Sequence, residues 1–324
     1  MSNISYMLYA CPMRRVTVVG SGVIGLSVAH ELARAGDAVT VVADADIAHT
    51  VSTVAAAVWF PYLSASPATG DWLTRSLARY RAISLDESAG VDLRAGTVVE
   101  RTPHPDRSWT PVVAGATEAT VLPEGALSGV RATVPVVTSG VYGEWLTARC
   151  RDLGVRFEVR GVASVDECAG NADLVVVAAG LRSGQLLGDD SSVVPVRGQV
   201  VRLENPGLTD WWIDDDNPGG LTYVVPRRDD IVCGGVSEVG ATSLELDDAT
   251  ERAILERTTA LVPQLAGLRI VSRGVGLRPS RPTVRLERVP GHAVPVIACY
   301  GHGGSGVTLS WGCAEAVVEL AQAG

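Results

Sequence analysis

Three glycines spaced as GxGxxG form the strongest local signal for chemistry in the chain. Gly20, Gly22 and Gly25 follow directly after a run of β-branched residues at 15–19. Gly20 allows a tight turn, Gly22 lets the backbone approach a pyrophosphate, and Gly25 lets the following helix pack closely on the strand. The N-terminus of that helix offers N–H groups and a positive dipole end to phosphates. We therefore expect dinucleotide binding, with a glycine-rich turn of any α/β protein as the alternative.

The elements around these glycines have the order strand, helix, strand. Apolar residues recur with helical spacing from Leu26 to Gly36, where a helix stop is favoured, and a second β-branched run covers 38–43. This run ends at Asp44. An acid at that place can hold the hydroxyl groups of a ribose, which disfavours the 2′-phosphate of NADP. The first unit alone leaves NAD and FAD open.

A second glycine-rich loop, at 300–308, directly precedes a segment with the pattern of an amphipathic helix that runs to Ala321. Close backbone approach and a helix dipole together favour a negative group, and a reduced flavin, anionic around N1 and C2=O, fits that description. A late strand at 172–180 ends in small residues, as do strands that pass near the cofactor in flavoproteins. These segments favour FAD, with a glycine-rich helix cap as the alternative for the loop.

Composition excludes several other chemistries. The chain of 324 residues has a net charge of -9, and its 27 basic residues are all arginines. Pyridoxal-phosphate enzymes, Schiff-base aldolases and Walker-type nucleotide hydrolases each need a lysine amine. The acidic balance without a basic run argues against nucleic acid and anionic membranes as partners. No apolar stretch is long enough for a membrane span, and we expect a cytoplasmic protein.

The cysteines and histidines have no metal-binding spacing. The six cysteines include no CxxC pair, and the five histidines form no HxxxH or HxH pair. We therefore expect small buried cysteines and no metal site. Residues 1–12 are expected to be a disordered leader.

Between the two glycine-rich loops, the pattern changes. The stretch 66–140 is interpreted as loop-rich with one helix at 72–83, and a further helix is expected within 140–154. Residues 193–236 contain alternating segments joined by turns, which predicts antiparallel strands. A helix at 249–263 follows.

Six separated motifs occur in one order, and together they resemble the D-amino-acid oxidase family of FAD flavoproteins from Arg14 onward. The motifs are the glycine-rich turn at 18–27, AAAVWFPY at 55–62, RGQ at 197–199, TYVVP at 222–226, GLRPSRP at 276–282 and YGHGGSGVT at 300–308. The resemblance implies an α/β fold with a Rossmann-like FAD-binding domain, discontinuous in sequence, and a substrate domain on a mostly antiparallel sheet. The implied FAD-binding domain is 13–65, 141–197 and 274–324, and the substrate domain is 66–140 and 198–273.

The resemblance also assigns roles to single residues. Arg278 would grip the substrate α-carboxylate, Tyr223 would be a second carboxylate partner, and the Gly304 carbonyl would accept a hydrogen bond from the substrate amine. A fork-shaped guanidinium is the best side-chain partner for a carboxylate, and we expect Arg278 on a stiff loop. A surface ion pair for Arg278 and plain packing for Tyr223 are the alternatives.

The implied cofactor is non-covalent FAD. The contacts carried over from the family are Gly20, Gly22, Val23, Ile24, Gly25, Ala43, Asp44, Ser52, Thr53, Ala55, Ala56, Val162, Ala179, Gly180, Arg278, Gly303, Gly304, Ser305, Gly306, Val307 and Thr308.

The implied activity is oxidative deamination of D-amino acids to 2-oxo acids, ammonia and hydrogen peroxide, with hydride transfer from the substrate Cα to flavin N5. His302 is interpreted as structural, because this transfer needs no base on carbon. The expected partners are a small D-amino acid and molecular oxygen, with a homodimer among the assemblies considered.

Two departures from the family bear on substrate choice. The lid tyrosine of the vertebrate oxidases corresponds to Gly219, so the lid is shorter or differently built. D-aspartate oxidases carry an arginine where this chain has Val236 and Ser237, and Arg227 and Arg228 are expected in a solvated turn. We therefore expect neutral D-amino acids as substrates. The alternatives are a D-aspartate oxidase, a glycine or sarcosine oxidase, an NAD-linked dehydrogenase and a non-catalytic flavin-binding protein.

Overall fold

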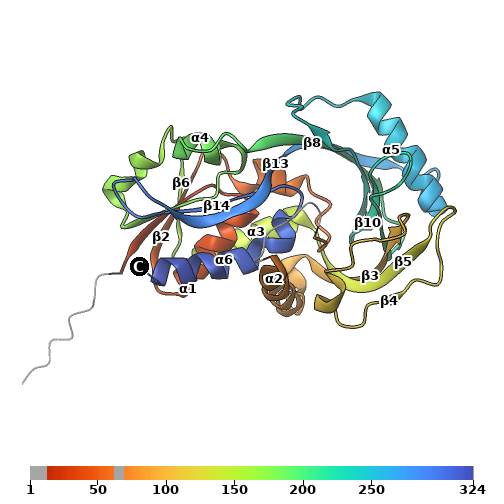
Figure 1. Ribbon diagram of the computed structural model, residues 1–324, viewed down its shortest axis with the longest axis horizontal. Coiled ribbons are helices and arrows are strands. Elements are labelled where there is room, and N and C mark those ends of the chain that lie inside the picture. Colours follow the sequence, from red (N-terminus) through yellow and green to blue (C-terminus); the bar gives the residue numbers. More distant parts are fainter. Residues whose placement is uncertain (1–12, 62–68, 324) are drawn as a thin grey trace, which may run out of the picture.

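The computed structural model describes residues 13–61 and 69–323, so the predicted leader at 1–12 lies outside the described residues. The strands join into one 14-stranded mixed sheet with the order β4-β5-β3-β9-β10-β11-β8-β13-β14-β7-β1-β2-β6, and β12 pairs with β8 off this path (Figure 1). Helices pack on this sheet, which confirms the α/β fold expected from the sequence. The division into two domains at the residues given above stays a prediction.

Five strands at one end of this order form the parallel part of the sheet. They are β14 (Val296–His302), β7 (Leu174–Val177), β1 (Arg15–Val19), β2 (Ala38–Ala43) and β6 (Arg156–Val159). Helices α1 (Val23–Arg34), α3 (Ser139–Asp152) and α6 (Gly306–Gln322) cover one face and enclose the largest core. A smaller core lies on the other face, next to α4 (Ser183–Leu187). The central strands are buried on both faces, which is why they are continuous β-branched runs in the sequence.

The remaining strands form the antiparallel part, which contains one parallel pair, β3 with β9. The bounds are β3 Val91–Glu100, β4 Thr117–Glu118, β5 Ser128–Val137, β8 Val194–Glu204, β9 Trp211–Asp214, β10 Thr222–Pro226, β11 Asp230–Gly234 and β12 Glu238–Val239. Helix α5 (Asp248–Leu261) covers the outer face, where Val201 and Val224 pack against Ile254. Strand alternation therefore turns Val200 and Tyr223 to the opposite face.

Strand β13 (Ile270–Val289) connects the two parts of the sheet. Its 20 residues pair with β8 over the first half and with β14 over the second. The segment 276–282, expected to be a stiff loop, lies inside this strand, so that expectation was wrong. Pairing from both sides overrides the local preference of a Pro-rich segment. Pro279 lies opposite Pro195, so the two missing N–H donors fall at one rung of the ladder.

The stretch 66–140 is more regular than its composition suggested. Helix α2 (Thr69–Ile83) corresponds to the predicted helix, but β3 and β5 pair over ten residues each, so the loop interpretation was wrong there. Gly96 shows why. A Cβ built at this position would lie 2.1 Å from the Trp211 ring. A glycine that resembled a turn signal thus makes room for a buried tryptophan from the neighbouring strand.

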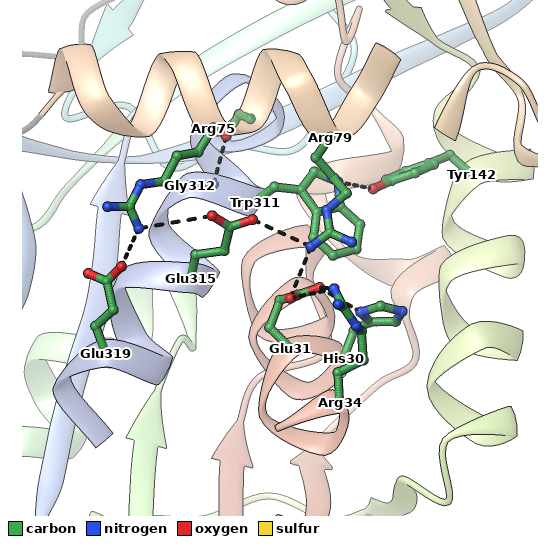
Figure 2. Close-up of polar contacts among 11 residues, drawn as sticks. His30, Glu31, Arg34, Arg75, Arg79, Tyr142, Trp311, Gly312, Glu315 and Glu319 are labelled. Atoms are coloured by element: carbon green, nitrogen blue, oxygen red, sulfur yellow. Dashed lines mark hydrogen bonds and ion pairs between the residues drawn. The ribbon is translucent and has the colours of Figure 1, made fainter. Parts of the chain in front are cut away.

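Helix α2 is attached to the two helices whose N-termini face the centre of the molecule (Figure 2). Arg79 of α2 forms ion pairs with Glu31 of α1 (3.0 Å) and Glu315 of α6 (3.4 Å). Its guanidinium also lies 5.0 Å from the centroid of the Trp311 ring. The Trp311 indole N–H donates to the Tyr142 hydroxyl of α3 (2.9 Å). One arginine therefore contacts α1 and α6 directly and, through Trp311, is connected to α3.

The remaining sequence expectations concern scattered residues. The cysteines at 150, 168, 233, 299 and 313 are free and buried, as expected, while Cys11 lies outside the described residues. Within the described ranges, no group of three or more His, Cys, Asp or Glu could hold a metal ion. None of the helices that the structure describes is long and apolar enough to cross a membrane.

Candidate active site

A cavity of about 450 Å³ is lined by residues from both parts of the sheet. Most of the residues predicted to bind cofactor or substrate line this cavity: Gly20, Gly22, Val23, Ile24, Ala43, Asp44, Ser52, Ala55, Ala56, Val162, Ala179, Gly180, Tyr223, Arg278, Gly303, Gly304, Gly306 and Val307. The other four predicted residues, Gly25, Thr53, Ser305 and Thr308, are outside the lining.

The turn between β1 and α1 has the geometry that its glycines suggested. Gly20 has a φ of +118°, and a Cβ there would lie 2.3 Å from the Ala178 carbonyl oxygen. A Cβ at Gly25 would lie 2.0 Å from the Gly20 carbonyl oxygen, so this residue serves packing behind the cavity. Gly22 is the N-cap of α1 without a side-chain cap, and the Val23 N–H donates to the Ser52 hydroxyl (3.1 Å). The first turn of α1 therefore faces the cavity with mostly backbone groups, as an anion site requires.

The cavity reaches the carboxyl end of β2 at Asp44. The Asp44 carboxylate pairs with Arg182 (3.0 Å), which also donates to the Val162 carbonyl (2.7 Å). Asp44 is four strand positions away from the strand that carries Arg278. At a strand spacing of about 4.8 Å, the two residues are separated by roughly 20 Å. This elongated shape suits an extended dinucleotide.

The loop between β14 and α6 brings a second helix N-terminus to the cavity. Gly301 and Gly303 have φ values of +83° and +54°, and the Gly303 N–H donates to the Pro279 carbonyl (2.8 Å). His302 between them is 3% exposed and lines the cavity, and its Nε2 has no hydrogen-bond partner within the described residues. Its burial is compatible with the structural role expected, which stays a prediction.

Arg278 and Tyr223 lie on a floor of glycines. A Cβ at Gly198 of β8 would come within 2.5 Å of the Arg278 Nη2, and one at Gly234 of β11 within 2.2 Å of the Tyr223 ring. Arg278 donates from Nη1 to the Val236 carbonyl (3.0 Å). Among the described residues, no carboxylate lies within 4.0 Å of its guanidinium. The glycines let both side chains lie close to the strands, and the arginine keeps a charge available for an anion.

The wall beside these two residues is apolar. It is formed by side chains that the sequence interpretation did not single out: Val54, Val58, Phe60, Val200, Ile213 and Leu221. Residues on four separate segments make this wall, so no local motif could have indicated it. A pocket with one fixed cation and apolar walls favours a ligand with a single carboxylate and an uncharged remainder.

The two arginines of the β10–β11 hairpin lie elsewhere, and one prediction about them was wrong. Arg228 is exposed and pairs with Asp92 (2.9 Å). Arg227, expected to be solvated, is buried and forms a bidentate pair with Asp230 (2.6 and 2.5 Å). A carboxylate three residues along the hairpin makes this burial affordable.

These features fit FAD. Two helix N-termini, at α1 and α6, face one cavity, and Gly22, Gly303 and Gly304 let backbone approach a flat or phosphorylated ligand. Asp44 at the far end would hold the ribose. Arg278 and Tyr223 remain beyond the span needed by the dinucleotide, where a small substrate can bind.

Comparison with known proteins agrees with this site. A family model described as FAD dependent oxidoreductase matches residues 15–320. The D-amino-acid oxidase of Rubrobacter xylanophilus is 43% identical over 324 residues, which cover 97% of this chain and 99% of that protein. The D-amino-acid oxidase of Streptomyces coelicolor is 36% identical, with 94% of this chain and 96% of that protein covered. The glycine oxidase structure from Bacillus cereus has a TM-score of 0.79 at 21% identity, covering 96% of this chain and 95% of that one, and shares the fold. The chain therefore belongs to the DAO family of FAD-dependent oxidoreductases and is an FAD-dependent amino-acid oxidase.

Proposed function

We propose that the protein oxidatively deaminates neutral D-amino acids to 2-oxo acids and ammonia, with formation of hydrogen peroxide from oxygen. The observation that carries this proposal is the Arg278 guanidinium, which has no carboxylate partner among the described residues and lies beside Tyr223 against an apolar wall. An amino acid with an uncharged side chain matches each of these groups. The two relatives described above carry the name D-amino-acid oxidase.

In this mechanism the protein orients the substrate. Arg278 forks around the α-carboxylate with Tyr223 as second partner, and the Gly304 carbonyl accepts a hydrogen bond from the amine. With both groups fixed, the Cα–H bond has one direction. The apolar wall excludes water from the reacting carbon. Bound FAD supplies the acceptor for the hydride from Cα and passes the two electrons to oxygen. The imino acid product then hydrolyses in water, so orientation is the main contribution of the protein.

Specificity for neutral side chains rests on the absence of a charge partner. None of the residues in the apolar wall is charged, and neither Val236 nor Ser237 provides a cation. An unpaired buried carboxylate costs several kcal/mol, which corresponds to roughly a hundredfold discrimination or more against D-aspartate. Relatives named D-aspartate oxidase are less similar to this chain than the two relatives above.

A substrate screen tests the proposal. We expect peroxide from D-alanine, D-valine and D-methionine, and kcat/KM for D-aspartate should be at least about a hundredfold lower under the same conditions. Glycine, sarcosine and L-amino acids serve as the competing substrates. If D-aspartate matches the neutral substrates, or if glycine or sarcosine exceeds them, the specificity proposed here is wrong.

We also propose that FAD is bound without a covalent link. His49 and Cys313 are the candidates for attachment, but Cys313 is fully buried outside the cavity lining and His49 is paired with Asp46 (2.7 Å). Acid precipitation should release all yellow colour into the supernatant, and colour left in the pellet would contradict the proposal. The homodimer and the cytoplasmic location stay predictions.

A further inference from the structure

A strap at residues 50–57 covers the cavity without belonging to any strand or α-helix. Three consecutive carbonyls of this strap accept hydrogen bonds from side chains that come from distant segments. Arg202 donates from Nη2 to the Thr53 carbonyl (3.1 Å) and the Val54 carbonyl (3.2 Å), and the Ser139 hydroxyl donates to the Ala55 carbonyl (3.0 Å). The same strap provides Val51, Val54, Ala55 and Ala56 to the cavity lining. Its conformation therefore depends on groups outside it.

The strap is also shaped by the strands below it. Its end at Ala57 has a φ of +57°, a conformation that non-glycine residues rarely adopt, and the Val137 N–H donates to the Ala57 carbonyl (2.8 Å). Val54 packs on β13 at Gly274, where a Cβ would lie 3.1 Å from its Cγ1. A chain segment with so few regular hydrogen bonds needs fixed side-chain donors to keep a single conformation.

The donor Arg202 is buried at an electrostatic cost. Its side chain is 13% exposed, and its nearest carboxylate, Asp230, is 3.9 Å away and already bound bidentately by Arg227. Burial and the neighbouring Arg227 lower the pKa of Arg202. Two buried arginines thus share one aspartate, and Arg227 closes the cluster with a contact to the Ser139 hydroxyl (3.5 Å). A surplus buried cation destabilises a fold, so its contacts to the strap are the gain that offsets it.

We propose that Arg202 is a positioning residue that holds the strap in its cavity-lining conformation before FAD arrives. In its absence the strap must be ordered by the cofactor itself, and this ordering reduces affinity. The proposal separates two quantities that a merely structural residue would change together. Cofactor affinity should depend on Arg202, whereas the stability of the cofactor-free fold should not.

The test uses the full-length apoprotein and the variant Arg202→Met, which keeps the apolar stem and removes the charge. We expect the Kd for FAD, measured by quenching of flavin fluorescence, to rise by roughly tenfold to a hundredfold. The Tm of the apoprotein should be equal to or higher than that of the wild type, because Arg227 and Asp230 remain as a neutral pair. Arg202→Lys should restore affinity to within about threefold, since an ammonium can donate to both carbonyls.

The matched control is Arg228→Met, which removes the exposed neighbour of the same hairpin and should leave the Kd for FAD unchanged. An Arg202→Met protein that binds FAD within about twofold of wild type would overturn the proposal. So would an equal loss of affinity in the Met and Lys variants together with a lower Tm, because that result describes a general structural role. The inference rests on the reversible FAD binding proposed above. Failure of that premise is recognised separately, because the wild type itself would then not yield an apoprotein that rebinds FAD.

Discussion

The two ends of the cavity are built by different means. At the parallel end, the groups that face the ligand are backbone groups of Gly20, Gly22 and the first turn of α1, and the glycines are there because a Cβ would not fit. At the antiparallel end, the groups are side chains, Arg278 and Tyr223, which come from strands far apart in the sequence. A local motif thus specifies the cofactor end, whereas sheet topology specifies the substrate end.

The difference has a consequence for what substitutions do. A side chain added at the parallel end meets backbone, which cannot move without distorting the strand or helix. A side chain added at the antiparallel end meets the end of another side chain, which can move and take the ligand with it. Damage at the first end should appear as loss of cofactor, and damage at the second as loss of turnover with the cofactor retained.

The largest expected effect is at the substrate end. Arg278→Ala should lower kcat/KM by roughly two to four decades, because a charge-assisted bidentate pair is worth about 3–5 kcal/mol. The flavin absorbance per protein should remain that of the wild type. Arg278→Lys should recover little, since an ammonium cannot form the fork.

Arg273→Ala is the matched control for this prediction, because Arg273 lies on the same strand but pairs with Glu251 at the surface (2.5 Å). It should keep wild-type kcat/KM. An Arg278→Ala enzyme within about threefold of wild type would show that the substrate carboxylate binds elsewhere.

At the cofactor end, Gly25→Ala should reduce FAD occupancy strongly and lower Tm. The added Cβ would lie 2.0 Å from the Gly20 carbonyl oxygen, so the turn that faces the pyrophosphate must shift. Overpacking of this kind costs about 1–3 kcal/mol. Flavin content after gel filtration and thermal unfolding measure both effects. Gly140→Ala, at a helical glycine with no atom within 4 Å of the built Cβ, is the neutral control. Full flavin content in Gly25→Ala would contradict the cradle described here.

Gly198→Ala sharpens the comparison with a smaller effect. Its Cβ would lie 2.5 Å from the Arg278 Nη2, the end of a side chain, so the guanidinium moves and the backbone does not. We expect KM to rise by roughly tenfold with little change in Tm or in the Kd for FAD. Loss of FAD in this variant would mean that the two ends are not separable.

The smallest effect concerns the contact between α2 and the cofactor helices. Burial alone would raise the pKa of Glu31, but a hydrogen bond from His30 and the charges of Arg79 and Arg34 outweigh it and hold the pKa below its usual value of 4.5. A lowered folded pKa stabilises the protein above the unfolded pKa, and this contribution is lost as pH falls through the folded value. Wild-type Tm should therefore decrease below about pH 4.5 more steeply than that of Glu31→Gln. Parallel Tm curves for the two proteins would contradict this assignment.

How far the sequence could predict the molecule follows the same division. The β1–α1–β2 unit, the last helix and the glycine loop before it were recognisable because adjacent residues determine their structure. Strands β3 and β5 were missed because Gly96 looked like a turn signal, and only the Trp211 ring from another strand explains it. Arg202 carried no signal at all, since its partners at the strap are about 150 residues away. The resemblance to a family supplied Arg278 and Tyr223, which spacing alone could not have done.

Strand β13 has a consequence for how the enzyme can move. One unbroken strand is hydrogen-bonded to β8 in the antiparallel part and to β14 in the parallel part, so no flexible linker separates them at this point. A clamshell motion would have to tear ladder hydrogen bonds on both sides of the active site. Substrate and product must therefore pass through local rearrangements of chain segments at the cavity mouth, while the catalytic arginine, carried by β13 itself, stays at a fixed place throughout the cycle. The same shared strand makes the protein one mechanical unit, and heat should melt it in a single cooperative step.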